Sequence, residues 1–332
     1  MILNPNKSYN KYISNIRKIH NKYREDKFYI PSHIGTELEK HDCPIVYNKE
    51  GNRMYTCFMA YDHPFENGNQ IMFDYSDWGL NVHFYGESEL NRIVGNPKIR
   101  LAFLGESQLI VKNQYDYVIE NQFEIENNFD YIFTFDERIL NEFKNAKYFP
   151  YPSTPWYGKK YGCKDNQYEF KEKNISIIAS NKSLTRLHRL RVEVAKRCKE
   201  EGLADAYGKF DGGEFLDNYD DAFRNYRYAI VIENNVSDYY FTEKITSCFA
   251  AQTVPIYLGA RRIGDFFNEN GIITVPENKP ELIYEILSNC CYEDYISRKD
   301  AIIDNYNRVK LYNGRWNWWF RNYGDIIEKA YG

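Results

Sequence analysis

A short stretch between two apolar runs gathers several side chains that could do chemistry. The residues ENNVSDYYFTEK at 233–244 include carboxylates, an asparagine pair, two neighbouring phenols and an ammonium group. They follow the apolar run YAIVI and lead into TEKITSCFAAQ, a segment of helical character. In open parallel sheets, ligands bind outside the carboxyl ends of the strands. The stretch is therefore predicted to line a ligand site.

The start of the following helix favours an anionic ligand. Thr242 is a good N-cap residue, which places Glu243 and Lys244 in the first helical turn. A helix N-terminus carries partial positive charge and free N–H groups, and both suit a phosphate. A lysine there is mildly unfavourable unless an anion such as a diphosphate is bound, so Lys244 is predicted to face a ligand. The alternative is that both charges are solvated and that the tyrosines pack on the sheet.

The whole segment ENNVSDYYFTEKI…VPIYLG resembles the donor-binding signature of glycosyltransferase family 10, the α-1,3-fucosyltransferases. That signature is a Glu-Asn pair, a spacer, an aromatic residue, Thr-Glu-Lys, a helix and Val/Ile-Pro-Ile-Tyr-x-Gly. Weaker similarity covers most of residues 70–280 and leaves out the first 60. The resemblance implies an α/β fold of the GT-B type, in which two Rossmann-like domains have parallel sheets that face each other across a cleft.

The resemblance also implies roles for individual residues. GDP-fucose would bind the C-terminal domain, where Lys244 would hold the diphosphate and Glu243 would bond ribose or fucose hydroxyls. Tyr240 and Asn234 would line the nucleotide and sugar pocket. The implied reaction is an inverting, metal-independent transfer of fucose to a hydroxyl of a glycan acceptor.

A second phosphate contact in the family is an arginine on the helix after the first strand of the C-terminal domain. Arg186, Arg189 and Arg191 are the candidates. The apolar face of this helix is formed by residues 187, 190, 194 and 198; Arg191 lies within it and Arg189 lies opposite. A charged side chain on an inward face needs a partner, so Arg191 is the first choice and Arg189 the second. The alternative is three solvated arginines.

The family places its catalytic carboxylate in a turn after a strand, and IRLAFLGES at 99–107 matches that arrangement. Glu106 would act as the general base that deprotonates the acceptor hydroxyl. Gln108 stands where many members have proline, which is a departure from the pattern. The alternative is that Glu106 is a surface residue at the end of a strand.

Composition excludes other function classes. The chain has 332 residues, a formal net charge of −4 and no long basic run, so nucleic acid is not an expected partner. Its seven cysteines show no CxxC pair, which favours reduced thiols in the cytoplasm. The first residues lack the apolar core of a signal peptide, and no apolar run approaches the roughly 18 residues of a membrane span. We expect a cytoplasmic protein, at most in peripheral contact with the inner face of a membrane.

No cofactor or metal is expected beyond the donor substrate. The six histidines show no HxxxH or HxH pattern, and Asp217, Asp220 and Asp221 are interpreted as solvated carboxylates. Three alternatives stay open: another nucleotide-activated sugar on the same fold, a non-catalytic nucleotide-sugar or glycan-binding protein, and a metal-dependent, single-domain transferase. By analogy alone, the acceptor glycan would be a cell-surface polysaccharide, a lipopolysaccharide or an N-acetyllactosamine type.

The order of apolar runs predicts two α/β halves. We expect an N-terminal acceptor domain at 1–150, a linker at 151–174, a donor domain at 175–310 and a C-terminal helix at 311–332 that packs back across the domains. Strands are expected at 44–47, 70–75, 80–85, 99–105, 115–119, 130–135, 175–180, 228–233, 254–259 and 272–275. Helical segments are expected within the first 30 residues and at 87–94, 137–144, 181–202, 214–226, 242–252, 261–267, 280–287 and 317–331.

Overall fold

The computed structural model describes residues 45–49, 57–59, 72–74, 79–150, 152–158, 162–312 and 314–331. The amphipathic helix expected within the first 30 residues lies outside this range. Contacts divide the chain into two compact units. Unit 1 holds the described residues up to Gly105, with Asn113–Phe149 and the segment from Gly314 onward; unit 2 holds Glu106–Lys112 and Pro150–Asn313. The described part of 151–174 therefore groups with unit 2, and the C-terminal segment groups with unit 1.

Unit 1 is built on a sheet whose described strands run in the order β2-β3-β1-β4-β5-β6-β7. All neighbouring strands are parallel except β2 and β3, which are antiparallel. The strands are β1 (Ile45–Lys49), β2 (Cys57–Met59), β3 (Met72–Asp74), β4 (Val82–Gly86), β5 (Ile99–Phe103), β6 (Tyr131–Thr134) and β7 (Ala146–Tyr148). The helices are α3 (Lys112–Glu120), α4 (Gln122–Asn128), α5 (Glu137–Glu142) and α11 (Arg315–Tyr331).

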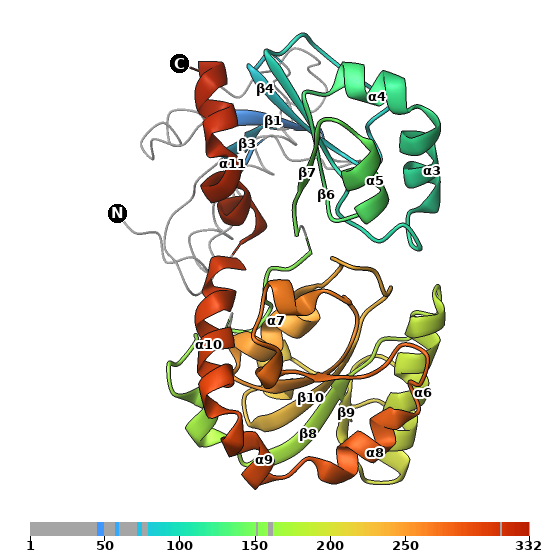
Figure 1. Cartoon of the computed structure of the whole chain (residues 1–332), viewed down its shortest axis with the longest axis vertical. Coiled ribbons are helices and arrows are strands. Elements are labelled where there is room, and N and C mark those ends of the chain that lie inside the picture. Colours follow the sequence, from blue (N-terminus) through green and yellow to red (C-terminus); the bar gives the residue numbers. More distant parts are fainter. Residues whose placement is uncertain are drawn as a thin grey trace, which may run out of the picture. The chain divides into compact units, whose positions relative to one another are not determined.

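The C-terminal helix α11 covers one side of this sheet with aromatic rings. Trp316 and Trp319 lie against Phe84 and Phe103, with ring centroids 5.1–6.2 Å apart. Lys98 Nζ also donates to the carbonyl of Ala330 at 2.8 Å. Figure 1 shows α11 on one side of the sheet and α3, α4 and α5 on the other. The expected tail helix is thus confirmed, and it closes the core of unit 1.

Two sequence-based predictions in unit 1 are wrong. The run at 115–119, expected as a strand, belongs to helix α3, where Tyr115 and Val118 lie one turn apart and are both buried. Five residues are too few to separate a two-residue period from a helical one. The segment 87–94, expected as a helix, forms turns. The hydroxyl of Tyr85 bonds both the N–H and the carbonyl of Val94, so a tertiary contact holds this segment.

Unit 2 contains a fully parallel sheet of described strands in the order β9-β8-β10-β11-β12. Its strands are β8 (Lys173–Ile178), β9 (Asp205–Tyr207), β10 (Tyr226–Ile232), β11 (Val254–Leu258) and β12 (Ile273–Thr274). Its α-helices are α6 (Arg186–Glu200), α7 (Glu243–Ala250), α8 (Leu282–Asn289), α9 (Tyr292–Ser297) and α10 (Lys299–Val309). Short 3₁₀ turns are η2 (Gln167–Phe170), η3 (Tyr219–Ala222), η4 (Ile263–Asp265), η5 (Glu269–Gly271) and η6 (Lys310–Tyr312).

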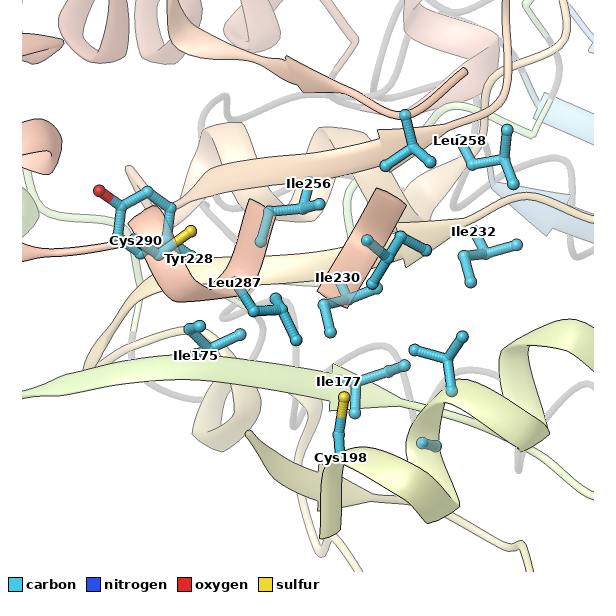
Figure 2. Packing of buried hydrophobic residues seen from close by; sticks show 14 of the residues in the cluster. Ile175, Ile177, Cys198, Tyr228, Ile230, Ile232, Ile256, Leu258, Leu287 and Cys290 are labelled. Carbon is cyan, nitrogen blue, oxygen red and sulfur yellow. The ribbon is translucent and has the colours of Figure 1, made fainter. Parts of the chain in front are cut away.

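Alternate residues of these strands face one hydrophobic core. Ile230 and Ile256 point toward α6 and α8, where Cys198 and Leu287 meet them (Figure 2). On the other side of the sheet lie α7 and α10 (Figure 1). Because both faces are covered, the central strands β10 and β11 are apolar along almost their whole length, which is the pattern that the sequence showed. Gly202 follows α6 with φ +66°, a left-handed conformation that confirms the expected helix end.

The strand order fixes where a ligand can bind in unit 2. From β8 the chain passes through α6 to the outer strand β9, whereas from β10 it passes through α7 to β11 on the other side. The connections leave the neighbouring carboxyl ends of β8 and β10 in opposite directions. Ligands of open α/β sheets bind at such a switch point. The residues after β8 and after β10 therefore form the candidate site.

Candidate active site

Helix α7 begins as the sequence predicted, but its lysine is already paired. Thr242 is the N-cap, and its hydroxyl oxygen accepts the backbone N–H of Lys244 at 3.3 Å. The ammonium of Lys244 lies 3.0 Å from Glu243 Oε1 and 3.4 Å from Glu233 Oε2. Two carboxylates therefore offset the unfavourable position of this cation at a helix N-terminus. The position alone does not require a bound anion.

The neighbouring carboxylates keep Lys244 in its charged form. Burial acts to lower the pKa of Lys244, but the carboxylates of Glu243 and Glu233 outweigh it and keep the pKa above its ordinary value. The side chain of Lys244 is 24% exposed, so part of it remains accessible. Lys244 is thus a charged, partly accessible cation at the carboxyl end of the sheet.

Arg191 is buried and incompletely bonded. It comes from α6, is 7% exposed, and donates from Nη2 to Asn234 Oδ1 at 2.8 Å. Its Nε finds no hydrogen-bond partner among the described residues. Burial lowers the pKa of Arg191 from its ordinary value, while Glu233 and Glu243 oppose that shift. A buried guanidinium with an unused donor is a strong candidate for contact with an anionic ligand.

The other candidate arginines lie elsewhere. Arg189 is exposed and donates to the carbonyl of Ser183, and Arg186 is exposed as well. The helical phase read from the sequence therefore predicted the inward position of Arg191 correctly. The second choice, Arg189, is not brought to Asn234 or Lys244 by any recorded contact.

Four of the residues singled out in the sequence form one chain of hydrogen bonds. Arg191 donates to Asn234, Asn234 Nδ2 donates to the hydroxyl of Tyr240 at 3.4 Å, and that hydroxyl donates to Glu106 Oε1 at 3.4 Å. Burial raises the pKa of Tyr240 well above its ordinary value, so the phenol keeps its proton and acts as a donor. The chain joins the cation on α6 to the carboxylate of Glu106, 85 residues earlier in the sequence.

Glu106 lies at the point where β5 ends. Its Oε1 accepts two hydrogen bonds, one from the backbone N–H of Ser107 at 2.8 Å and one from the hydroxyl of Tyr240. The turn continues with Ser107, whose carbonyl accepts the N–H of Ile110 and whose hydroxyl accepts the N–H of Leu109. Just before it, Gly105 donates its N–H to Glu87 Oε2 at 2.6 Å. The carboxylate of Glu106 is thus fixed by its own turn without a proline at position 108.

Two residues at the centre of the site, Glu233 and His188, were not predicted from the sequence. Glu233 is fully buried, accepts hydrogen bonds from Thr242 and forms an ion pair with Lys244. His188 forms a capping box with Thr185 at the start of α6. Burial, with the charges of Arg191, Lys182 and Lys244, lowers the pKa of His188 to about 4, so it is neutral near pH 7. Glu233 could have been found from the sequence, because it is a carboxylate that directly follows an apolar strand.

The carboxylates at 217–221 do not behave as one solvated group. Asp217 and Asp221 are exposed as expected, but Asp220 is 2% exposed and accepts the N–H of Gly158 at 3.0 Å. The expected helix at 214–226 is also wrong, because it contains only the short turn η3. Within the described residues, no three His, Cys, Asp or Glu side chains are grouped closely enough to hold a metal ion. No described helix is long and apolar enough to cross a membrane.

Gly259 is expected to be sensitive to the smallest enlargement. A Cβ atom at this position would lie 2.3 Å from Tyr257 Oη and 2.6 Å from Glu233 Cγ, and both side chains are buried. Gly259→Ala should lower the free energy of unfolding by about 1–3 kcal/mol, because neither neighbour can retreat within a packed core. Thermal unfolding followed by circular dichroism measures this loss. An unchanged midpoint would show that the neighbours can move at little cost.

One region of the chain matches a known protein family. Residues 168–289 match the family model described as glycosyltransferase family 10 (fucosyltransferase), C-terminal part. No curated protein sequence matches the chain. A solved α1,3-fucosyltransferase with GDP is 17% identical with a TM-score of 0.48, over 80% of this chain and 83% of its own. The same kind of enzyme with GDP-fucose is 16% identical with a TM-score of 0.46, over the same shares. Sucrose-phosphate synthase from Thermosynechococcus elongatus is 11% identical with a TM-score of 0.50, over 77% and 75%.

The similarity to sucrose-phosphate synthase indicates a shared fold, and the two units with largely parallel sheets are those of the GT-B type. The family match of residues 168–289 identifies the protein as a glycosyltransferase. The match of residues 168–289 to the C-terminal part of the family 10 model confirms the resemblance seen in the segment 233–259.

Proposed function

We propose that this glycosyltransferase moves fucose from GDP-fucose to a hydroxyl of a glycan acceptor, with inversion and without a metal ion. One observation carries the proposal: the buried guanidinium of Arg191 has an unused donor and is linked through Asn234 and Tyr240 to Glu106. A cation suited to a diphosphate and a carboxylate suited to a proton transfer thus belong to one hydrogen-bonded unit. The match of residues 168–289 to a fucosyltransferase family model supports fucose as the sugar.

In the proposed reaction, Glu106 takes the proton of the acceptor hydroxyl. The acceptor oxygen attacks the anomeric carbon from the side opposite the diphosphate, and the bond from that carbon to the phosphate oxygen breaks. The electron pair of this bond leaves with GDP, so the configuration at the anomeric carbon inverts. Lys244 and Arg191 would stabilise the negative charge that develops on the leaving diphosphate. Glu243 would bond hydroxyls of the ribose or of the fucose.

The compartment is a further part of the proposal. Cys163, Cys198, Cys248, Cys290 and Cys291 are free thiols. Free thiols suit a reducing environment, which supports a cytoplasmic location.

The test is an assay of GDP release from GDP-fucose over a panel of glycan acceptors, each with and without EDTA. We expect acceptor-dependent release that EDTA leaves unchanged, and a product whose anomeric configuration, measured by NMR, is opposite to that of the donor. GDP-mannose in place of GDP-fucose is the matched control. Equal or faster transfer from GDP-mannose would remove fucose from the proposal, and loss of activity in EDTA would remove metal independence.

Arg191→Ala is expected to weaken GDP binding by roughly 10- to 100-fold, as for the loss of a charge-assisted hydrogen bond to a phosphate. Isothermal titration calorimetry with GDP measures the effect. Arg189→Ala is the matched control on the same helix, and it should bind GDP as the parent protein does because its side chain is exposed. If Arg189→Ala is the damaging variant, the diphosphate contact has been assigned to the wrong arginine.

A further inference from the structure

We propose that Glu233 is a positioning residue, which aims the ammonium of Lys244 and ties together the two ends of the loop at 233–242. The role given to it rests on the proposed function, because Lys244 is a diphosphate contact only within that function. The geometry that supports it lies in the protein alone.

Within the described residues, every hydrogen-bond or ion-pair partner of the Glu233 carboxylate is a donor. The carboxylate is 0% exposed. Its Oε1 accepts the backbone N–H of Thr242 at 2.9 Å, and its Oε2 accepts the hydroxyl of Thr242 at 2.8 Å. The ammonium of Lys244 lies 3.4 Å from Oε2. Burial raises the pKa of Glu233 from its ordinary value, and Lys244 opposes that shift. An ionised carboxylate has acceptors alone, so it matches a set of partners that are all donors.

The hydroxyl of Thr242 connects the Glu233 carboxylate to the ammonium of Lys244. A hydroxyl has one proton to give and two lone pairs to offer. Thr242 gives its proton to Glu233 and accepts from the backbone N–H of Lys244 at 3.3 Å and from its Nζ at 2.9 Å. The hydrogen-bonding capacity of this hydroxyl is thus fully used. Lys244 donates to Thr242, and Thr242 donates to Glu233. A donor in place of the carboxylate would reverse the hydroxyl and turn its proton toward the ammonium.

Glu233 also closes the loop that carries the rest of the site. It directly follows β10, and its N–H donates to the carbonyl of Leu258 at 2.9 Å. Thr242 caps α7 at the other end of the loop. One buried carboxylate therefore links the first and the last residue of a segment that contains Asn234 and Tyr240. This contact fixes both loop ends before a ligand arrives.

The two carboxylates around Lys244 are placed for different tasks. Glu243 reaches the surface, with 15% of its side chain exposed, whereas Glu233 has none. Glu243 can turn to a sugar hydroxyl while Glu233 keeps the ammonium paired. Lys244 would then stay charged and aimed during donor binding.

The first experiment follows the titration of Lys244 in the ligand-free protein. Its amine is labelled with an amine-specific reagent at a series of pH values, and modification of this residue is quantified by mass spectrometry. The groups that act on Lys244 are Glu233 at the end of β10, Glu243 on α7, Arg191 and His188 on α6, and Tyr219 on η3. Glu233→Gln removes one carboxylate, so the pKa of Lys244 should fall. At a pH below that pKa, labelling should be about tenfold faster for each unit of decrease.

Asp238→Asn is the matched control, since Asp238 lies in the same loop but pairs with Arg261. It should leave the titration of Lys244 unchanged. An unchanged titration in Glu233→Gln would overturn the inference. If Glu233→Gln does not fold, Glu233→Asp keeps the charge with a shorter reach and should still lower the pKa of Lys244; no change in that variant would overturn the inference equally.

The second experiment separates this inference from the proposed function. Calorimetry with GDP should show binding about tenfold weaker in Glu233→Gln, with a partial recovery in Glu233→Asp. Absence of GDP binding by the parent protein would defeat the proposed function, while the titration of Lys244 would still decide the role of Glu233. Full GDP affinity in Glu233→Gln would show that Lys244 needs no such support.

Discussion

Glu106→Gln is expected to lower turnover with acceptor by about a hundredfold or more while GDP binding survives. Glutamine keeps the shape of the side chain, and its amide oxygen can still accept from Ser107 and from Tyr240. It cannot take a proton at neutral pH, so general-base catalysis is lost. Steady-state rates of GDP release with acceptor measure the effect, and calorimetry with GDP measures donor binding.

Slow hydrolysis of the donor should persist in this variant, because bond breaking depends mainly on Lys244 and Arg191. Glu120→Gln, an exposed carboxylate at the end of α3, is the matched control and should keep parental activity. Near-normal transfer by Glu106→Gln would exclude Glu106 from the mechanism. Loss of GDP binding instead would place Glu106 in the donor subsite.

Lys244→Ala should produce the second large effect, on nucleotide affinity. A diphosphate would lose a charge-assisted partner worth roughly 1.5–3 kcal/mol, which corresponds to about 10- to 150-fold weaker GDP binding. The substitution also leaves the buried carboxylate of Glu233 without its cation, so thermal stability should fall as well. Calorimetry on folded protein, below the new unfolding midpoint, separates the two effects.

The ratio of GDP affinity to guanosine affinity is the sharper measurement. Loss of a phosphate contact lowers this ratio, whereas general damage to the site lowers both affinities together. Lys199→Ala, which removes an exposed lysine that pairs with Glu214, should leave the ratio unchanged. A ratio that also stays constant in Lys244→Ala would contradict the proposed diphosphate contact.

Local patterns in the sequence predicted much of what positions the site. The apolar runs located β5, β8, β10 and β11, because the buried residues of these strands are mostly apolar. Thr242 was predicted as the N-cap of α7, because its side chain satisfies an N–H only two residues away. The inward position of Arg191 followed from helical phase. The prediction at 87–94 failed because a contact with Tyr85 holds that segment in turns. The prediction at 115–119 failed because five residues are too few to define a period.

The sequence by itself thus determined which residues stand at the ends of strands and starts of helices, since those features depend on neighbours along the chain. Only the tertiary structure decided which of them meet. It paired Lys244 with Glu233, buried Asp220 against Gly158, and joined Arg191 to Glu106 through Asn234 and Tyr240. The reason is physical: such contacts connect side chains up to 134 positions apart, and their distances are set by how strands and helices pack rather than by any local period.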